Sequence, residues 1–456
     1  MRAFFARQTQ QQPAPFREEP RLVEVPPVAE ASGGTLLDLK SRLHQRLIDE
    51  LNLSVIERMP RPQFEQEIGD IIRDLLKSEP VILSEEQRVR LVADILNELM
   101  GLGPLEPLLQ DSSISDIIAN THNQICVERG GKIEITSVRF KDDAHLLRII
   151  NKIVTNIGRR IDEGQPIVDA RLADGSRVSA VIPPVAVDGP LLAIRKFARI
   201  PYDLDLLIGK DTITPDIKSV LEAVVRGRLN ILISGGTGSG KTTMLNAMSA
   251  AIGERETVVT IEDAAELQLQ QPMVRRLETR PANAEGRGEI TQRDLVRAAL
   301  RMRPDRIIIG EVRGGEAFDM LQAMNTGHEG SMSTIHANTP RDALSRLEQM
   351  IGMAGLEMAP RMVRSQIASA IHVVIQLVRG ADGRRRLVSF QEVTGMEGEV
   401  ITTNEIFRFR RLSTDAEGLI HGHYVATGIR PRFAEGLATQ NLSLPPDIFA
   451  PNRRLE

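Results

Sequence analysis

The chain has 456 residues, of which 41% are hydrophobic and 26% are charged, and its formal net charge is −4 with 57 basic residues. This composition is typical of a multidomain globular protein and gives no support for a surface that binds nucleic acid directly. A lone cysteine excludes a disulfide framework and a four-cysteine zinc site, and no run approaches the roughly 18 apolar residues of a membrane-spanning helix, so we expect a cytoplasmic protein.

Residues 1–34 are polar, rich in glutamine and interrupted by five prolines, a composition that cannot bury a core. They predict a disordered arm. Whether this arm binds a localisation partner or only tethers the rest of the chain stays open at this point.

Residues 35–100 carry apolar side chains at helical spacing in three successive stretches, and Ser84 with Gln87 forms a capping-box pattern before the third. They predict a small three-helix bundle. Its apolar faces either pack on one another or dock a partner. The spaced residues are Leu36, Leu39, Leu43, Leu47 and Leu51; Phe64, Ile68, Ile71 and Leu75; and Val89, Val92, Leu96 and Leu99.

Residues 101–200 change to short alternating runs and predict a β-rich second domain. Strands are expected at 115–119, 124–128 and 132–136, followed by a helix at 145–157. A hairpin should turn at 173–175, and the domain should close near 192–197. The proline-containing segment 198–216 reads as a linker.

Residues 201–400 alternate apolar runs with helical stretches, which predicts a parallel, doubly wound α/β sheet. The expected strands are 229–234, 257–261, 306–309, 331–335 and 372–378. Residues 401–456 read as a small C-terminal appendage of unclear purpose.

A P-loop follows the first of these strands and leads into a helical pattern. Its backbone amides and the helix N-terminus can surround phosphates, Lys241 can reach the β- and γ-phosphates, and the Thr242 hydroxyl can ligate Mg²⁺. The sequence therefore predicts binding of a nucleoside triphosphate. The P-loop residues are Gly235, Gly236, Thr237, Gly238, Ser239, Gly240, Lys241 and Thr242.

Acidic residues follow two other strands at the edge where the ligand of a parallel sheet binds. Glu262, Asp263 and Glu266 come after one strand, and Glu311 takes the position of a Walker B acid after another, with Gly310 before it. We expect Glu311 and Glu262 to share the positioning of metal and water. Asp263 and Glu266 are equally well explained as capping or surface acids.

Two histidines flank the next strand. His336 follows it and His328 precedes it. Neither has enough neighbouring ligand residues for a metal site, and an imidazole near the terminal phosphate could report its loss, although a lone histidine is more often structural.

Arg177 and Arg195 lie in the preceding domain. A guanidinium there would stabilise charge in phosphoryl transfer if that domain leans over the nucleotide; the alternative is a surface salt bridge.

Taken together, these motifs resemble the signature set of the secretion-superfamily ATPases, which drive type II and type IV secretion and type IV pili. Further segments resemble the CpaF/TadA branch, the motor of Tad (Flp) pili. The first set comprises the P-loop and residues 260–263, 303–314 and 326–338; the second comprises residues 101–109, 277–281, 286–291 and 426–433.

The resemblance implies a RecA-like motor domain preceded by a PAS-like α+β domain and a three-helix bundle, assembled as a homohexamer. It implies hydrolysis of ATP to ADP and phosphate with Mg²⁺, by a cytoplasmic protein peripherally associated with the inner membrane. The work would be pilus extension and retraction through inner-membrane platform proteins. By resemblance, Glu262, Glu311 and His336 are catalytic, Arg177 and Arg195 supply arginines at a domain or subunit boundary, and His328 and Glu266 belong to the nucleotide site.

Two alternatives remain open. One is a conjugation-type secretion ATPase that powers effector or DNA transfer. The other is a nucleotide-binding scaffold that does not hydrolyse, against which the paired acids and the histidine segment argue.

Overall fold

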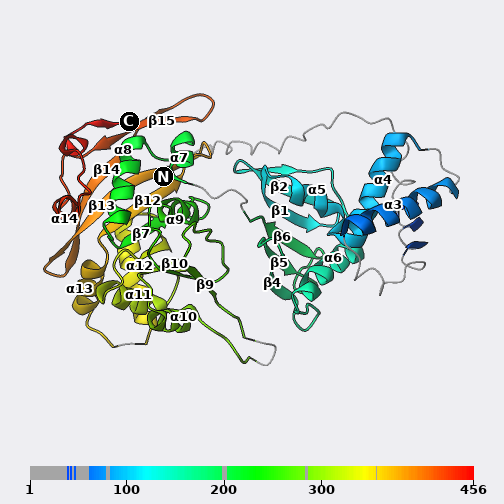
Figure 1. Cartoon of the computed structure of the whole chain (residues 1–456), viewed down its shortest axis with the longest axis horizontal. Helices are drawn as coiled ribbons and strands as arrows, with labels where there is room; N and C mark the ends of the chain where they lie inside the picture. The colour runs from blue at the N-terminus through cyan, green and yellow to red at the C-terminus, as the bar shows by residue number, and fades with distance from the viewer. Residues whose placement is uncertain are drawn as a thin grey trace, which may run out of the picture. The chain divides into compact units, whose positions relative to one another are not determined.

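A computed structural model describes residues 39–40, 42–43, 46–47, 61–78, 83–197, 203–282, 286–355 and 357–456. The chain divides into two compact units, before and after residue 198 (Figure 1). The second unit begins at residue 198, which is the first residue of the predicted linker. The predicted arm, residues 1–34, lies outside the described residues.

The first unit begins with helices that pack through one apolar cluster. Helix α4 starts with the predicted capping box, in which Ser84 accepts a hydrogen bond from the Gln87 amide and the Gln87 side chain accepts one from the Ser84 amide. The predicted register is partly wrong, because Ile71 and Val89 are exposed. The buried members are Leu39, Leu43, Leu47, Ile68, Ile72, Leu76, Leu83, Leu91 and Ile95.

The rest of the first unit is an antiparallel sheet with helix α6 packed against it. Among the described residues the strand order is β3-β2-β1-β6-β5-β4, and the β4–β5 hairpin turns where the sequence predicts it. Helix α6 begins at Asp143, two residues before the predicted start, because Asp142 caps the His145 amide at 2.7 Å. The elements are α3 (Arg61–Ser78), α4 (Glu85–Met100), η1 (Gly103–Leu105), α5 (Glu106–Gln110), β1 (Ile114–Thr121), β2 (Gln124–Arg129), β3 (Lys132–Ile135), α6 (Asp143–Asn156), β4 (Ile167–Arg171), β5 (Arg177–Val181) and β6 (Leu191–Arg195).

The second unit is built on one large mixed sheet. Its strand order among the described residues is β16-β15-β14-β13-β12-β7-β11-β10-β8-β9, and the strands from β12 to β9 run parallel, as predicted. The elements are α7 (Leu204–Gly209), α8 (Pro215–Arg226), β7 (Ile231–Gly235), α9 (Lys241–Ser249), β8 (Val258–Glu262), β9 (Val274–Glu278), α10 (Gln292–Ala299), η2 (Leu300–Met302), β10 (Arg306–Val312), α11 (Glu316–Asn325), β11 (Met332–His336), α12 (Pro340–Met353), α13 (Pro360–Ala370), β12 (Val373–Arg379), β13 (Arg385–Glu397), β14 (Val400–Thr414), β15 (Ile420–Ala426), α14 (Phe433–Thr439), η3 (Pro446–Phe449) and β16 (Arg454–Leu455).

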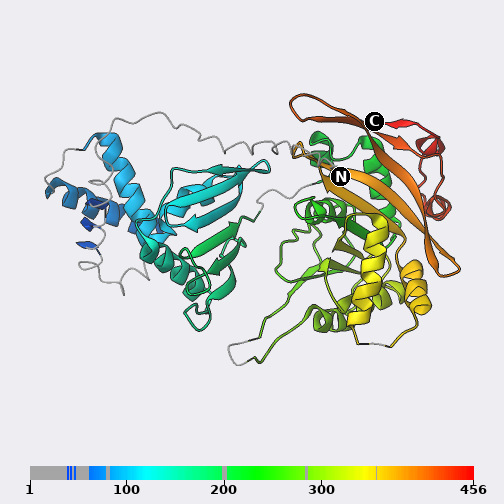
Figure 2. The same ribbon diagram turned by 180° about the vertical axis from the view of Figure 1, so that it is seen from behind.

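Helices cover both faces of the parallel strands. Along β7, Ile231 and Ile233 face the cluster that includes α7, α8 and α9, whereas Leu232 faces the cluster that includes α10 to α13. Figure 2 shows the second layer, with the yellow helices in front of the sheet. Because successive side chains of a strand point to opposite faces, continuous apolar strands need this double covering, which is the predicted doubly wound arrangement.

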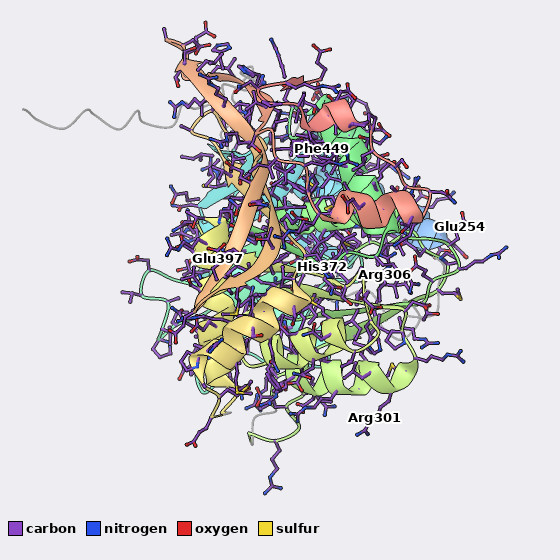
Figure 3. The ribbon with its side chains drawn as sticks, turned by 90° about the vertical axis from the view of Figure 1, so that its left-hand side faces the viewer. Glu254, Arg301, Arg306, His372, Glu397 and Phe449 are labelled. Atoms are coloured by element: carbon purple, nitrogen blue, oxygen red, sulfur yellow. The ribbon has the colours of Figure 1, made fainter. Side chains whose placement is uncertain are left out.

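Two parts of the second unit differ from the expectation. Part of the predicted linker is helix α7, whose first turn is capped by Asp203 at the Leu206 amide (2.7 Å). The predicted appendage extends the main sheet through β14, β15 and β16, and Phe449 stacks on Phe407 of β14 (Figure 3). Strand β14 carries many polar and charged residues, so apolar runs alone did not reveal that it continues the sheet, although β13, β14 and β15 are successive antiparallel strands.

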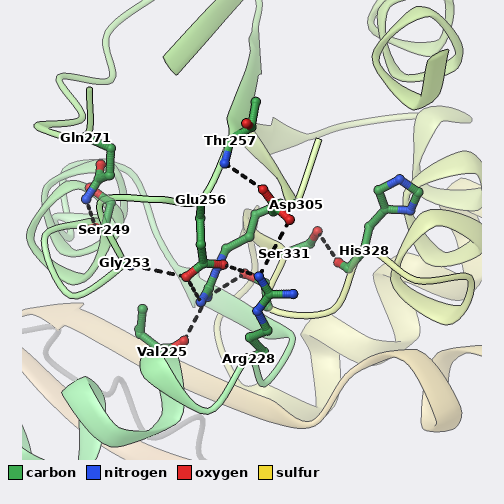
Figure 4. Close-up of polar contacts among 12 residues, drawn as sticks. Val225, Arg228, Ser249, Gly253, Glu256, Thr257, Gln271, Asp305, His328 and Ser331 are labelled. Atoms are coloured by element: carbon green, nitrogen blue, oxygen red, sulfur yellow. Dashed lines mark hydrogen bonds and ion pairs between the residues drawn. The ribbon is translucent and has the colours of Figure 1, made fainter. Parts of the chain in front are cut away.

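A buried ion pair joins the amino ends of β8 and β10 (Figure 4). Arg306 is fully buried, its Nε and Nη2 donate to the Glu256 carboxylate at 2.8 and 2.9 Å, and its Nη1 donates to the Val225 carbonyl at 2.8 Å. A buried guanidinium needs such complete pairing to offset its lost hydration. The contact fixes the end of the sheet where β8 and β10 begin, opposite the end that carries the P-loop.

Candidate functional site

The P-loop lies between the end of β7 and the start of α9, as predicted. Gly240 has a φ of +94°, a backbone conformation that favours glycine, and it immediately precedes the first residue of the helix. Gly235 must also be small, because a Cβ there would lie 2.6 Å from the Leu377 carbonyl oxygen of β12. The turn therefore aims the free amides of a helix N-terminus at one point, which is the geometry that suits phosphate.

Lys241 is buried under this turn. Its Nζ donates to the carbonyls of Gly235 and Gly236 at 3.0 and 3.1 Å and lies 3.2 Å from Nε2 of His336. Burial lowers the pKa of Lys241, and the charge of Glu311 opposes that shift. The side chain is thus a buried cation held within the P-loop turn.

His336 and Glu311 meet next to Lys241 because β10 and β11 are parallel neighbours. Nε2 of His336 lies 3.1 Å from Oε1 of Glu311, so this nitrogen contacts both the lysine and the acid. Burial and the charge of Lys241 lower the pKa of His336, although Glu311 acts in the other direction. The lowered pKa favours the neutral form of the imidazole.

Arg313 continues this line of contacts. Its Nη2 donates to Oε2 of Glu311 at 2.7 Å and its Nη1 to Oδ2 of Asp263 at 3.0 Å. Asp263 also accepts a hydrogen bond from Gln292 at 2.9 Å. Sequence reasoning missed Arg313 as a site residue, although its place two residues after Glu311, at strand spacing, could have shown that both side chains share a face.

Glu262 is the last residue of β8, at the carboxyl end of the strand as expected, and its side chain contacts the backbone that follows. Its carboxylate is buried, and Oε2 accepts hydrogen bonds from the amides of Glu266 and Leu267 at 2.7 and 2.9 Å. It packs on Gly310, where a Cβ would lie 2.9 Å from Glu262 Cγ. This contact explains the glycine before Glu311. Glu262 shapes the turn that follows β8, and its role toward metal stays a prediction, as does that of Glu266.

The other predicted residues lie elsewhere. His328 precedes β11, at the end of the sheet opposite the P-loop, where its carbonyl accepts a hydrogen bond from Ser331 at 2.7 Å (Figure 4). Lys241, Glu311 and His336 together form what we call the Lys241 centre. The structure does not bring His328 to this centre. In the first unit, Arg177 and Arg195 are cross-strand partners on β5 and β6, and Arg195 also pairs with Asp116 at 3.1 Å.

The residues around the P-loop fit a magnesium nucleotide. Mg²⁺ is usually held in such sites by one or two protein oxygens together with phosphates and water, which Thr242 of α9 and Glu311 can provide. Within the described ranges, no group of three or more histidine, cysteine or acidic side chains could hold a metal.

The sequence matches one protein family over most of its length. Residues 98–412, more than half of the chain, match the model of the type II/IV secretion system protein family. The chain belongs to the type II/IV secretion system protein family. The matched range includes the P-loop, Glu311 and His336.

Individual members of this family are similar over most of their length. A putative conjugal transfer protein of Mycobacterium tuberculosis is 40% identical over 328 residues, which cover 71% of this chain and 93% of that protein. The conjugal transfer protein TrbB of Rhizobium radiobacter is 32% identical, with coverages of 69% and 92%. The type IV secretion system protein PtlH of Bordetella pertussis is 36% identical, with coverages of 63% and 92%.

Among solved structures, the VirB11 ATPase of the Brucella suis type IV secretion system, in complex with sulphate, is 26% identical. The match covers 64% of this chain and 96% of that one, with a TM-score of 0.35. Among the helices that the structure describes, none combines the length and the apolar character needed to cross a membrane.

Proposed function

We propose that this secretion-family protein binds Mg-ATP on its P-loop and hydrolyses it to ADP and phosphate to power transfer through a membrane machine. The contact of His336 with both Lys241 and Glu311 carries the proposal, because it places a cation, an acid and an imidazole around one point beside the P-loop. Such preorganised groups stabilise the charge of phosphoryl transfer.

Each residue has a distinct role in this proposal. Lys241 neutralises the terminal phosphates, and Thr242 with Glu311 holds the Mg²⁺, which withdraws charge from the phosphate oxygens when bound. Glu311 orients the attacking water, and His336 donates or accepts a hydrogen bond near the γ-phosphate. Arg177 and Arg195 remain candidates for supplying positive charge from the first unit.

The names of the relatives favour a conjugation-type or type IV secretion machine over a Tad pilus. Their names refer to conjugal transfer and to type IV secretion. The Tad motor, with pilus extension and retraction, rests only on the branch-like segments of the sequence. We further propose a homohexamer that acts on inner-membrane platform proteins from the cytoplasmic side.

A Glu311→Gln variant tests the hydrolytic role. It removes the acid while keeping the side-chain size, so ATP binding should stay within a few-fold of wild type while phosphate release falls by about 100-fold or more. Binding is measured with a fluorescent ATP analogue and turnover by phosphate release. A variant that turns over at the wild-type rate contradicts the role of Glu311. A wild-type protein that binds ATP without turnover supports the scaffold alternative instead.

A gene deletion in the host separates the two machines. Loss of DNA or protein transfer with normal surface pili supports the conjugation-type function, whereas loss of pili alone supports the Tad motor.

A further inference from the structure

The turn between β12 and β13, residues 380–384, lies beside the P-loop although it is more than a hundred residues away in sequence. Strand β12 pairs in parallel with β7, with Leu377 opposite Gly235. Both strands therefore end at the same edge of the sheet. The chain that leaves β12 and returns as β13 must pass next to the phosphate-binding turn.

Three successive arginines at this turn have three different partners. Arg384 donates to Asp211 at 2.7 Å, Arg385 donates through Nε to the Gly238 carbonyl at 2.9 Å, and Arg386 donates to Asp382 at 2.6 Å. The last pair is buried, and the hydrogen bond from Arg386 lowers the pKa of Asp382 to about 2. The turn is thus fixed by Arg386, while Arg385 reaches the P-loop.

Arg385 touches the P-loop at the residues that would surround phosphate. Its Cδ lies 3.2 Å from the point where a Cβ on Gly240 would stand, and Nη1 of Arg379 lies 3.4 Å from the equivalent point on Gly238. Arg379 and Arg385 are also cross-strand partners. Like charges directly opposite each other destabilise a sheet, and a phosphate beside the two guanidinium groups would reduce their repulsion.

We propose that Arg385 contacts the phosphate chain of a nucleotide held on the P-loop of its own subunit, with Arg379 adding a second positive charge. The inference rests on the proposed nucleotide site. Because Nε donates to the Gly238 carbonyl, the planar guanidinium lies against the P-loop. Its Nη groups can then donate to phosphate oxygens, and arginine can make two such hydrogen bonds side by side.

This contact differs from that expected of Arg177 and Arg195. Those arginines belong to the first unit, so their action requires a particular arrangement of two units or two subunits. Arg385 belongs to the unit that carries the P-loop. It would therefore strengthen nucleotide binding regardless of how the units are arranged, and it would act on ADP as well as on ATP.

Arg385→Gln tests the inference, with Arg384→Gln as the matched control on the same turn. Full-length proteins are titrated with fluorescent ADP and ATP analogues, and thermal unfolding is followed without nucleotide. Arg385→Gln should weaken binding of both nucleotides roughly tenfold to a hundredfold, since a charge-assisted contact is lost. Arg384→Gln should change binding less than about twofold, because its partner is Asp211 at the surface. Arg385→Lys should give an intermediate affinity.

The outcomes separate this inference from the proposed function. If wild type binds both nucleotides and Arg385→Gln binds them as well as Arg384→Gln does, the phosphate contact is wrong while the nucleotide site stands. If wild type binds neither, both proposals fail. If Arg385→Gln is largely unfolded at the titration temperature without nucleotide, its role is structural and the inference is overturned; we expect at most a small decrease in the unfolding temperature, because the variant loses one hydrogen bond to Gly238 while the repulsion from Arg379 is relieved.

Discussion

At the scale of single residues, the site depends on the contact between Gly310 and Glu262. The glycine allows the buried carboxylate of Glu262 to pass beside β10 and hold the turn that follows β8. Asp263 of that turn is linked through Arg313 to Glu311. A larger residue at position 310 should therefore displace Glu311 through these contacts, although the substitution removes no polar group.

Gly310→Ala should displace Glu262 and reduce phosphate release about tenfold or more, with a stability loss of about 1–3 kcal/mol from overpacking. Phosphate release and denaturant unfolding of the full chain measure the two effects. Gly209→Ala is the matched control, because a Cβ at the end of α7 would meet nothing within 4 Å. Equal activity in Gly310→Ala and wild type would show that Glu262 can move freely and does not order the site.

At the scale of elements, Glu98 joins the helices that open the first unit to α6. Its carboxylate pairs with Lys40 at 2.9 Å and with Nε2 of His145 at 2.9 Å, and it is almost fully buried. Burial alone would raise the pKa of Glu98, but the hydrogen bond from His145 and the charge of Lys40 outweigh it and lower the pKa from 4.5 to about 2.

Glu98→Gln should therefore weaken the first unit by up to about 3 kcal/mol at pH 7. The folded-state pKa is lowered, so this contribution is complete above pH 4.5 and is lost as the pH falls toward 2. Hydrogen exchange of α4 and α6 amides measures it in the full chain, with the exposed Glu85→Gln as control. A loss of protection that is equally large at pH 7 and near pH 2 would contradict the ion-pair explanation.

The sequence predicted elements whose cause is local. The P-loop, the capping box at Ser84 and the hairpin at 173–175 follow from glycines, caps and turn residues that act within a few positions. The parallel strands followed from long apolar runs, since both faces of the sheet are covered. These features agree with the structure.

Other features depend on contacts that no local pattern records. Helix α3 buries Ile72 and leaves Ile71 exposed. Packing against the neighbouring helices decides which of these two adjacent apolar residues faces inward. Arg385 reaches Gly238 only because β12 pairs with β7, and β16 joins the sheet only by pairing with β15 after the intervening α14 and η3. The turning of Glu262 toward its own backbone likewise requires the close passage of Gly310 on another strand.

At the scale of the whole molecule, family membership and the site lead to one account of function. The chain belongs to the type II/IV secretion system protein family, and its second unit gathers a P-loop, an acid, a histidine and arginines at one edge of a sheet. The proposed function predicts that this chain hydrolyses ATP through the Lys241 centre as an oligomer.

The most direct test is steady-state phosphate release with Mg-ATP by the purified full chain and by Lys241→Ala, with the mass of each measured in solution. The account predicts release by a hexamer that falls by about 100-fold or more in the variant, since the buried cation beside the phosphates is lost. Equal release by the two proteins, or ATP binding without release by wild type, would contradict it.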